Sequence, residues 1–150
     1  MPRVDRSASV SWEGNLARGD GRISVPSGVF SGAAYSAATR IAQRPETTTP
    51  EELLAAAHAG CFAMSLAGEL TRAGTPPERL DVTAQVTLDE VPGQGHLVVR
   101  SAISARARVP GADEASFSQV VAEADAGCTF SALIRASAEV QVDATLEGGE

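Results

Sequence analysis

Cys61 and Cys128 are the two cysteines of this 150-residue chain, and they carry its most distinctive chemistry. A thiolate is a nucleophile that peroxides oxidise to a sulfenic acid, and a second thiol can convert this acid to a disulfide. Taken alone, Cys61 is more simply explained as an inert thiol, since free cysteine is often buried and packs as a small hydrophobe. Cys128 could likewise be an unrelated cysteine. Two cysteines in a reducing compartment are more often redox-active than a structural disulfide.

A reactive Cys61 requires a stabilised thiolate. The residue lies about eleven positions into a predicted helix, beyond the first turn where the helix dipole acts, and burial raises the pKa of a thiol. We therefore expect a cation to approach from elsewhere. The chain has no lysine, so this cation must be an arginine or a protonated histidine.

The predicted helix begins with the capping-box pattern Thr49-x-x-Glu52, with Pro50 at its first position. Residues 53–67 are apolar on nearly every face, and Gly74 is predicted to end the helix. An apolar run of ~15 residues is too short to span a bilayer. We expect a core helix that is buried on every side.

Short strands are predicted before this helix. The turn Gly19-Asp20-Gly21 predicts a hairpin between residues 16–18 and 22–25, and the next strand is expected at 29–30. Residues 32–48 show no clear periodicity and are predicted to be irregular.

Alternating apolar residues after the helix predict two strands, at 80–88 and 97–109, that pair as a hairpin. A second helix is expected to begin near Asp113 and to end with Gly127 in the left-handed conformation. Further helical turns and a final strand at 138–146 follow.

This order of elements predicts a single α+β domain over residues 1–150 with antiparallel sheets. One chain of this size has few elements that could surround a helix apolar on all faces. We therefore expect a homodimer in which two such helices pack together beneath two sheets. The net charge of −7 argues against binding to nucleic acid or to an anionic membrane. The N-terminus has no apolar targeting segment, so we expect a cytoplasmic protein.

Two alternatives to redox chemistry remain open from the residues alone. His58, Cys61, His96 and Cys128 could bind zinc, although no C-x-x-C or H-x₃-H pair is present. We favour His58 as a core histidine with both ring nitrogens satisfied, and expect no metal or other cofactor. The chain could instead be a dimer that binds an apolar ligand and contains an inert Cys61.

Several segments of the chain resemble the OsmC/Ohr family of thiol-dependent peroxidases, which reduce organic hydroperoxides. Residues 50–62, PEELLAAAHAGCF, resemble the first-cysteine motif, and residues 125–128, DAGC, resemble the second. Trp12-Glu13-Gly14 is similar to the N-terminal part of the OsmC branch. Thr49 and Thr129 depart from the family, which often has Asn and Pro at these positions.

The resemblance implies an intertwined homodimer with two central helices. It also implies that Cys61 is the peroxidatic cysteine, that Cys128 is the resolving cysteine, and that Arg40, held by Glu51, is the required cation. A dithiol of the lipoyl type would reduce the resulting disulfide. Apolar walls are expected to favour organic hydroperoxides, and the residues expected to form them are Phe62, Met64 and Phe130.

Helix length restricts how Glu51 can act. Ten residues of helix span ~15 Å, so Glu51 cannot reach Cys61 of its own helix if the helix begins at Pro50. Either the helix begins later, or Arg40 and Glu51 of one subunit serve Cys61 of the other. We predict the second arrangement.

Overall fold

The computed structural model describes residues 2–148. They form two compact units, the first ending at Leu53 and the second beginning at Leu54. The interpretation of the chain as one domain stays a prediction.

The first unit contains a three-stranded antiparallel sheet in the order β1-β2-β3. Its strands are β1 (Ser9–Glu13), β2 (Asp20–Ser24) and β3 (Ala33–Tyr35). Trp12 and Tyr35 meet edge to face with ring centroids 5.7 Å apart. A Cβ at Gly21, which lies between them, would come within 2.3 Å of the Tyr35 ring, so this position requires glycine.

Three expectations for this unit are wrong. Residues 16–18 lie in the turn, and the hairpin partner of β2 is β1. The turn is set at Gly14, which has φ +86°, and at Asn15, whose side chain accepts a hydrogen bond from the Arg18 N–H. Residues 29–30 are not a strand either, because the Val25 N–H donates to the Phe30 carbonyl and closes a loop there. The predicted irregular region also contains β3 and a short helix, α1 (Ala37–Arg40).

The long helix α2 (Pro50–Arg72) begins where the capping pattern predicts. The Thr49 hydroxyl accepts a hydrogen bond of 3.1 Å from the Glu52 N–H. Gly74 ends the helix with φ +83°, and the Thr75 N–H donates to the Leu70 carbonyl. This bond is typical of the glycine-based C-terminal motif. The alternative of a later helix start is therefore wrong.

The second unit contains a mixed three-stranded sheet in the order β4-β5-β6. The predicted hairpin is confirmed in β4 (Arg79–Val91) and β5 (Gly95–Arg108). The last strand, β6 (Glu139–Glu147), pairs parallel to β5, so the expectation of purely antiparallel sheets is wrong here. The reason is the crossover through α3 (Glu114–Gly127) and α4 (Thr129–Arg135), which returns the chain to the starting end of β5. The α+β class is confirmed.

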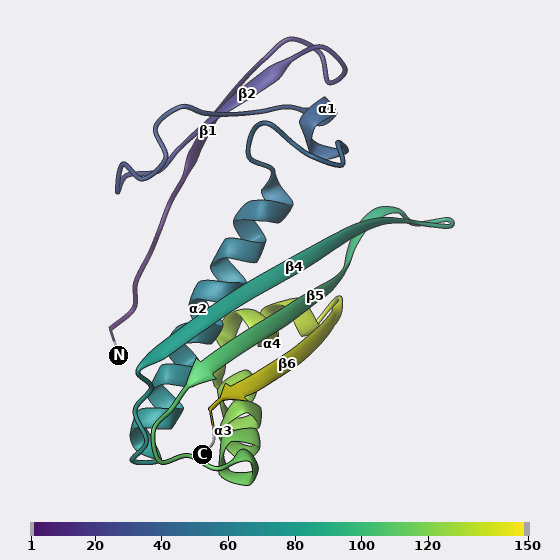
Figure 1. Ribbon diagram of the computed structural model, residues 1–150. Helices are drawn as coiled ribbons and strands as arrows, with labels where there is room; N and C mark the ends of the chain where they lie inside the picture. Colours follow the sequence, from purple (N-terminus) through teal and green to yellow (C-terminus); the bar gives the residue numbers. More distant parts are fainter. Residues whose placement is uncertain (1, 149–150) are drawn as a thin grey trace. The chain divides into compact units, whose positions relative to one another are not determined.

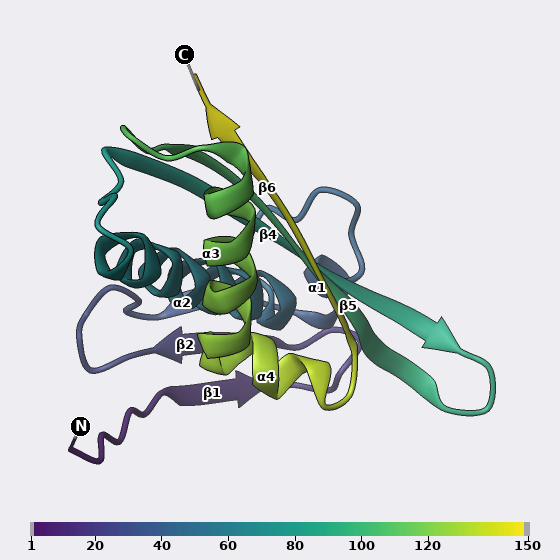
Figure 2. The same cartoon turned by 90° about the horizontal axis from the view of Figure 1, so that it is seen from below.

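Within the second unit, α3, α4 and the unit's part of α2 cover one face of the sheet (Figures 1 and 2). Inward residues of β5 such as Ile103 and Ala105 meet Phe62, Leu66 and Phe117 in a single core. On β5, Arg106 and Arg108 alternate with these residues and are exposed. The alternation explains why only one face of the sheet is covered.

Helix α2 buries only one face in this chain, whereas burial on every side was expected. The buried residues follow a helical spacing: His58, Phe62, Leu66 and Leu70. On the opposite side Met64 is 78% exposed. By length and composition α2 could cross a membrane. Its buried residues Phe62, Leu66 and Leu70 pack into the core of the second unit.

Candidate functional site

The two cysteines come together in the second unit. The Cys128 thiol donates a hydrogen bond of 3.4 Å to Cys61 Sγ, although 67 positions separate the two residues in the chain. Both thiols are free. The expected pairing of Cys61 and Cys128 in space is therefore present in the reduced chain.

Cys128 is placed by the junction of two helices. It caps the C-terminus of α3 and the N-terminus of α4, with φ −76° and ψ 114°. Its sulfur accepts the Ser131 N–H at 3.5 Å. Gly127 is the last residue of α3, so its expected left-handed conformation is wrong. The extended backbone of Cys128 makes the turn, and a residue with positive φ is not needed.

Cys61 is placed by α2 and by the contact of this helix with α3. One turn after Cys61, the Ser65 hydroxyl donates a 2.7 Å hydrogen bond to the Ala124 carbonyl. Ala124 lies four residues before Cys128 and is fully buried. This bond fixes the position of α3 along the axis of α2. It therefore also fixes the position of Cys128 relative to Cys61.

Hydrogen bonds lower the pKa of Cys61. Burial raises this pKa, but the Thr129 hydroxyl, 3.5 Å from Sγ, lowers it. The backbone N–H of Phe130, the Cys128 thiol and the backbone N–H of Thr129 lower it further, and the result is a pKa below the ordinary value. The requirement for a cation was therefore too strict. The first residues of α4 already supply donors.

The two thiols are not equivalent. Cys128 is 1% exposed, whereas Cys61 is partly exposed. The hydrogen bonds also run in one direction, from the Ser131 N–H to Cys128 and from the Cys128 thiol to Cys61. Cys61 at the end of this series is suited to the thiolate form, because a thiolate only accepts hydrogen bonds.

A buried histidine supports the same region. His58 is fully buried, with Nδ1 2.7 Å from the Ser101 hydroxyl on β5 and Nε2 2.8 Å from the Ser131 hydroxyl on α4. The interpretation of His58 as a satisfied core histidine is confirmed. Both nitrogens are engaged, and residues 2–148 contain no cluster of three His, Cys, Asp or Glu side chains that could hold a metal ion. The geometry gives no support to the zinc alternative.

Stability should depend on pH through His58. Burial lowers the pKa of His58 in the folded chain, so below about pH 6.5 the unfolded chain binds a proton that the folded chain does not. The free energy of unfolding should therefore fall as the pH falls from 7 to 5.5, with a slope from this residue of at most ~1.4 kcal/mol per pH unit. Urea denaturation over this range measures the slope.

The control is the other histidine of the chain, His96. His96→Gln should keep the pH dependence of wild-type stability, and His58→Gln should lose most of it. An equal pH dependence in wild type and His58→Gln would show that His58 is not its source.

Arg40 and Glu51 meet in the first unit. Arg40 is the last residue of α1, and Glu51 lies in the first turn of α2. The Nε and Nη2 atoms of Arg40 both donate hydrogen bonds to Glu51 Oε1, at 2.9 and 2.6 Å. This hydrogen bond raises the pKa of Arg40. Arg40 keeps 45% of its side chain exposed and Glu51 only 12%, so the carboxylate holds a guanidinium that still faces solvent.

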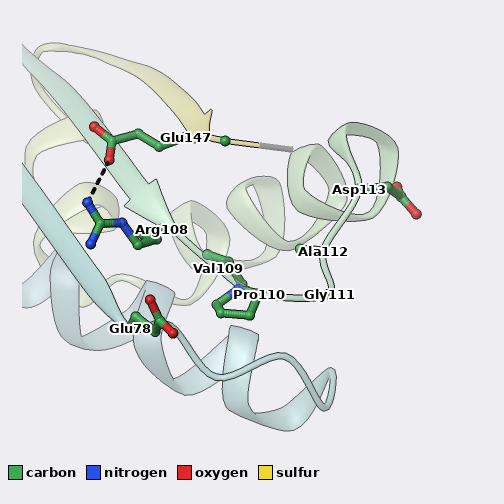
Figure 3. Close-up of a pocket in the computed structure, with 9 residues that line it drawn as sticks. Glu78, Arg108, Val109, Pro110, Gly111, Ala112, Asp113 and Glu147 are labelled. Carbon is green, nitrogen blue, oxygen red and sulfur yellow. Dashed lines mark ion pairs between the residues drawn. The ribbon is translucent and has the colours of Figure 1, made fainter. Parts of the chain in front are cut away.

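Neither Phe62 nor the cavity at the end of the sheet in the second unit has the features of a peroxide site. Phe62 is fully buried in the core, so the expectation that it lines a substrate pocket is wrong. A cavity of about 590 Å³ lies at the end of the sheet, between Glu78, Arg108 and Glu147 (Figure 3). Arg108 and Glu147 approach to 4.0 Å there. The cavity lining contains no cysteine and no histidine.

Three polar residues of this region were missed from the sequence. Ser101 occupies an inward position of β5, where a polar residue between Val99 and Ile103 could have indicated a buried partner. Ser131 lies three residues after Cys128 and gives no comparable signal. Thr129 stands out in the sequence only as a departure from the family, and its contact with Cys61 could not be read from the spacing.

Comparison with known proteins bears on the cysteine pair and its surroundings. Residues 43–143 match the model of the family described as OsmC-like protein. This range contains both cysteines. The chain belongs to the OsmC-like family. It is 37% identical to peroxiredoxin OsmC of Escherichia coli K12 over 144 residues, which cover 96% of this chain and 98% of that protein. The same figures hold for peroxiredoxin OsmC of Shigella flexneri. The resemblance to OsmC proteins is confirmed.

Solved structures of OsmC and Ohr proteins share the fold. An organic hydroperoxide resistance protein OsmC from Legionella pneumophila is 20% identical, with a TM-score of 0.69 and coverage of 95% of this chain and 99% of that one. OhrB of Bacillus subtilis is 22% identical, with a TM-score of 0.67 and coverage of 93% and 98%. The expected OsmC-like fold is therefore confirmed.

Proposed function

We propose that this protein is a thiol-dependent peroxidase that reduces organic hydroperoxides, with Cys61 as peroxidatic and Cys128 as resolving cysteine. One observation carries the proposal: a buried thiol donates to a more exposed cysteine 3.4 Å away, and that cysteine has a lowered pKa. The curated relatives named peroxiredoxin OsmC support the same reaction class.

The reaction has two oxidative steps. The Cys61 thiolate attacks the terminal oxygen of R–O–OH, so that an S–O bond forms, the O–O bond breaks, and the alkoxide takes up a proton and leaves as R–OH. Cys128 then loses its proton and attacks the sulfur of the Cys61 sulfenic acid, so that an S–S bond forms and water leaves. The contact between the sulfurs means that this second step needs only a small approach.

A dithiol must regenerate the enzyme. It reduces the Cys61–Cys128 disulfide by thiol–disulfide exchange and is itself oxidised to a disulfide. The resemblance to OsmC proteins favours a reductant of the lipoyl type. Partly buried Phe130 and exposed Met64 are the apolar residues left to favour an organic peroxide, since Phe62 is excluded by its burial.

The working unit in this proposal is a homodimer in the cytoplasm. Apolar or small residues recur every four positions on the uncovered face of α2. They are Ala56, Gly60, Met64 and Gly68, and such a face is suited to packing against a second copy of the chain. Arg40, held by Glu51, would stabilise negative charge on the reacting oxygens. Because α2 is continuous from Pro50, we propose that this pair serves Cys61 of the partner subunit.

Mass spectrometry after one equivalent of an organic hydroperoxide tests the peroxidase. We expect the wild-type chain to form a Cys61–Cys128 disulfide with release of one equivalent of alcohol. Cys128→Ser should also release one equivalent of alcohol, but its Cys61 should stop at sulfenic acid and reach sulfinic acid with excess peroxide. Two unmodified thiols and intact hydroperoxide in the wild type would contradict the proposal.

A further inference from the structure

Thr129 is the residue of α4 that lies beside the proposed nucleophile. It is the first residue of this helix and follows Cys128 directly. Its Oγ1 lies 3.5 Å from Cys61 Sγ, within the range of a hydrogen bond that involves sulfur. Between residues 2 and 148 the structure gives this hydroxyl no other hydrogen-bond partner.

The direction of this hydrogen bond follows from the state of Cys61. A hydroxyl can donate or accept, but a thiolate can only accept. When Cys61 is ionised, the Thr129 hydroxyl must therefore be the donor, and a bond to an ionised acceptor is stronger than a neutral one. The branched Cβ of threonine also restricts rotation about χ1, so the hydroxyl needs little ordering to point at the sulfur.

We propose that the Thr129 hydroxyl is a further catalytic residue, which stabilises the Cys61 thiolate by donating a hydrogen bond to it. The role assumes the peroxidase function proposed above, in which the thiolate reacts. The hydroxyl acts on the thiolate, whereas Arg40 is proposed to act on the reacting oxygens, so the two roles are distinct. The hydroxyl also comes from the same unit as the nucleophile. The lowered pKa of Cys61 supports this role, with the Thr129 hydroxyl the largest influence that lowers it.

Few other groups near Cys61 could stabilise its thiolate. Cys128 is the titratable side chain that faces it, at 3.4 Å. The remaining donors are the backbone N–H groups of Thr129 and Phe130, which a side-chain substitution leaves in place. Thr129→Val therefore removes one donor with almost no change of shape, and Thr129→Ser restores it.

The experiment measures how alkylation of Cys61 by iodoacetamide depends on pH, with each cysteine quantified by peptide mass spectrometry. Thr129→Val should shift the pH profile of Cys61 upward by about one unit and slow its alkylation about tenfold at pH 6. The alkylation rates of Cys61 in the wild type and in Thr129→Val should become equal above pH 10, where the thiol is ionised in both proteins. Thr129→Ser should resemble the wild type, as should Thr83→Val, which changes an exposed threonine on β4.

Rate measurements separate this role from the peroxidase itself. If the wild type reduces hydroperoxide, Thr129→Val should react about tenfold more slowly at neutral pH, with an unchanged circular dichroism spectrum. An unchanged alkylation profile in Thr129→Val, or a Thr129→Ser variant that behaves like Thr129→Val, would overturn the role of the hydroxyl. A wild-type chain that alkylates as expected but leaves hydroperoxide intact would overturn only the peroxidase proposal.

Discussion

Cys61→Ser is expected to lower the rate of organic hydroperoxide reduction by at least ~1,000-fold, because a serine hydroxyl ionises far less readily than a cysteine thiol and is a weaker nucleophile. The substitution removes the nucleophile and changes little else, since serine can keep the hydrogen bonds from Thr129 and Cys128. A stopped assay of residual hydroperoxide, run with excess dithiol, measures the loss.

The matched control for Cys61→Ser is Cys128→Ser. Both variants lose one thiol and cannot form the internal disulfide, but only Cys128→Ser retains the nucleophile. The control should consume one equivalent of hydroperoxide at the wild-type rate. If Cys61→Ser consumed peroxide catalytically, or if both variants were equally inactive in the first turnover, Cys61 would not be the peroxidatic residue.

Mixed dimers should show which subunit supplies Arg40. Arg40→Met removes the cation and Cys61→Ser removes the nucleophile, and each homodimer should be nearly inactive. When the two variants are unfolded together and refolded, half of the dimers are mixed. If Arg40 acts on the partner subunit, each mixed dimer has one complete site, and activity should recover to about a quarter of the wild-type value.

The opposite arrangement gives a clear contrary result. If Arg40 acts on Cys61 of its own chain, one site of the mixed dimer has the thiol without the guanidinium, and the other has the guanidinium without the thiol. Neither site is then complete, and no recovery would be seen. Refolding each variant alone is the control for losses during the procedure, and mass spectrometry of the intact dimers verifies that mixing occurred.

Local sequence signals predicted the elements of this chain that depend on local physics. The start of α2 was clear from Thr49 and its end from Gly74, because capping and left-handed glycine are properties of a few adjacent residues. The β4–β5 hairpin followed from alternation. The parallel pairing of β6 could not be predicted this way, because it depends on where the crossover helices return the chain.

Some residues of the candidate site could also be predicted from local motifs, and others could not. Cys61, Cys128, Arg40 and Glu51 were identified from motifs, and the structure brings the first two together in one unit and the last two together in the other. The donors that lower the pKa of Cys61 were missed because they come from a helix 68 positions away in the chain. Contacts of this kind depend on the packing of α4 and leave no local pattern.

Cys128 joins α3 to α4 and also contacts Cys61, so its two roles are coupled. In the reduced chain its sulfur accepts the Ser131 N–H and so completes the first turn of α4. In the proposed Cys61–Cys128 disulfide this sulfur would be a poorer acceptor and would turn toward Cys61, so we expect the first turn of α4 to be held less firmly. That turn also carries the Thr129 hydroxyl. If the proposed disulfide forms, oxidation should therefore loosen the segment that we propose activates Cys61, and reduction should restore it.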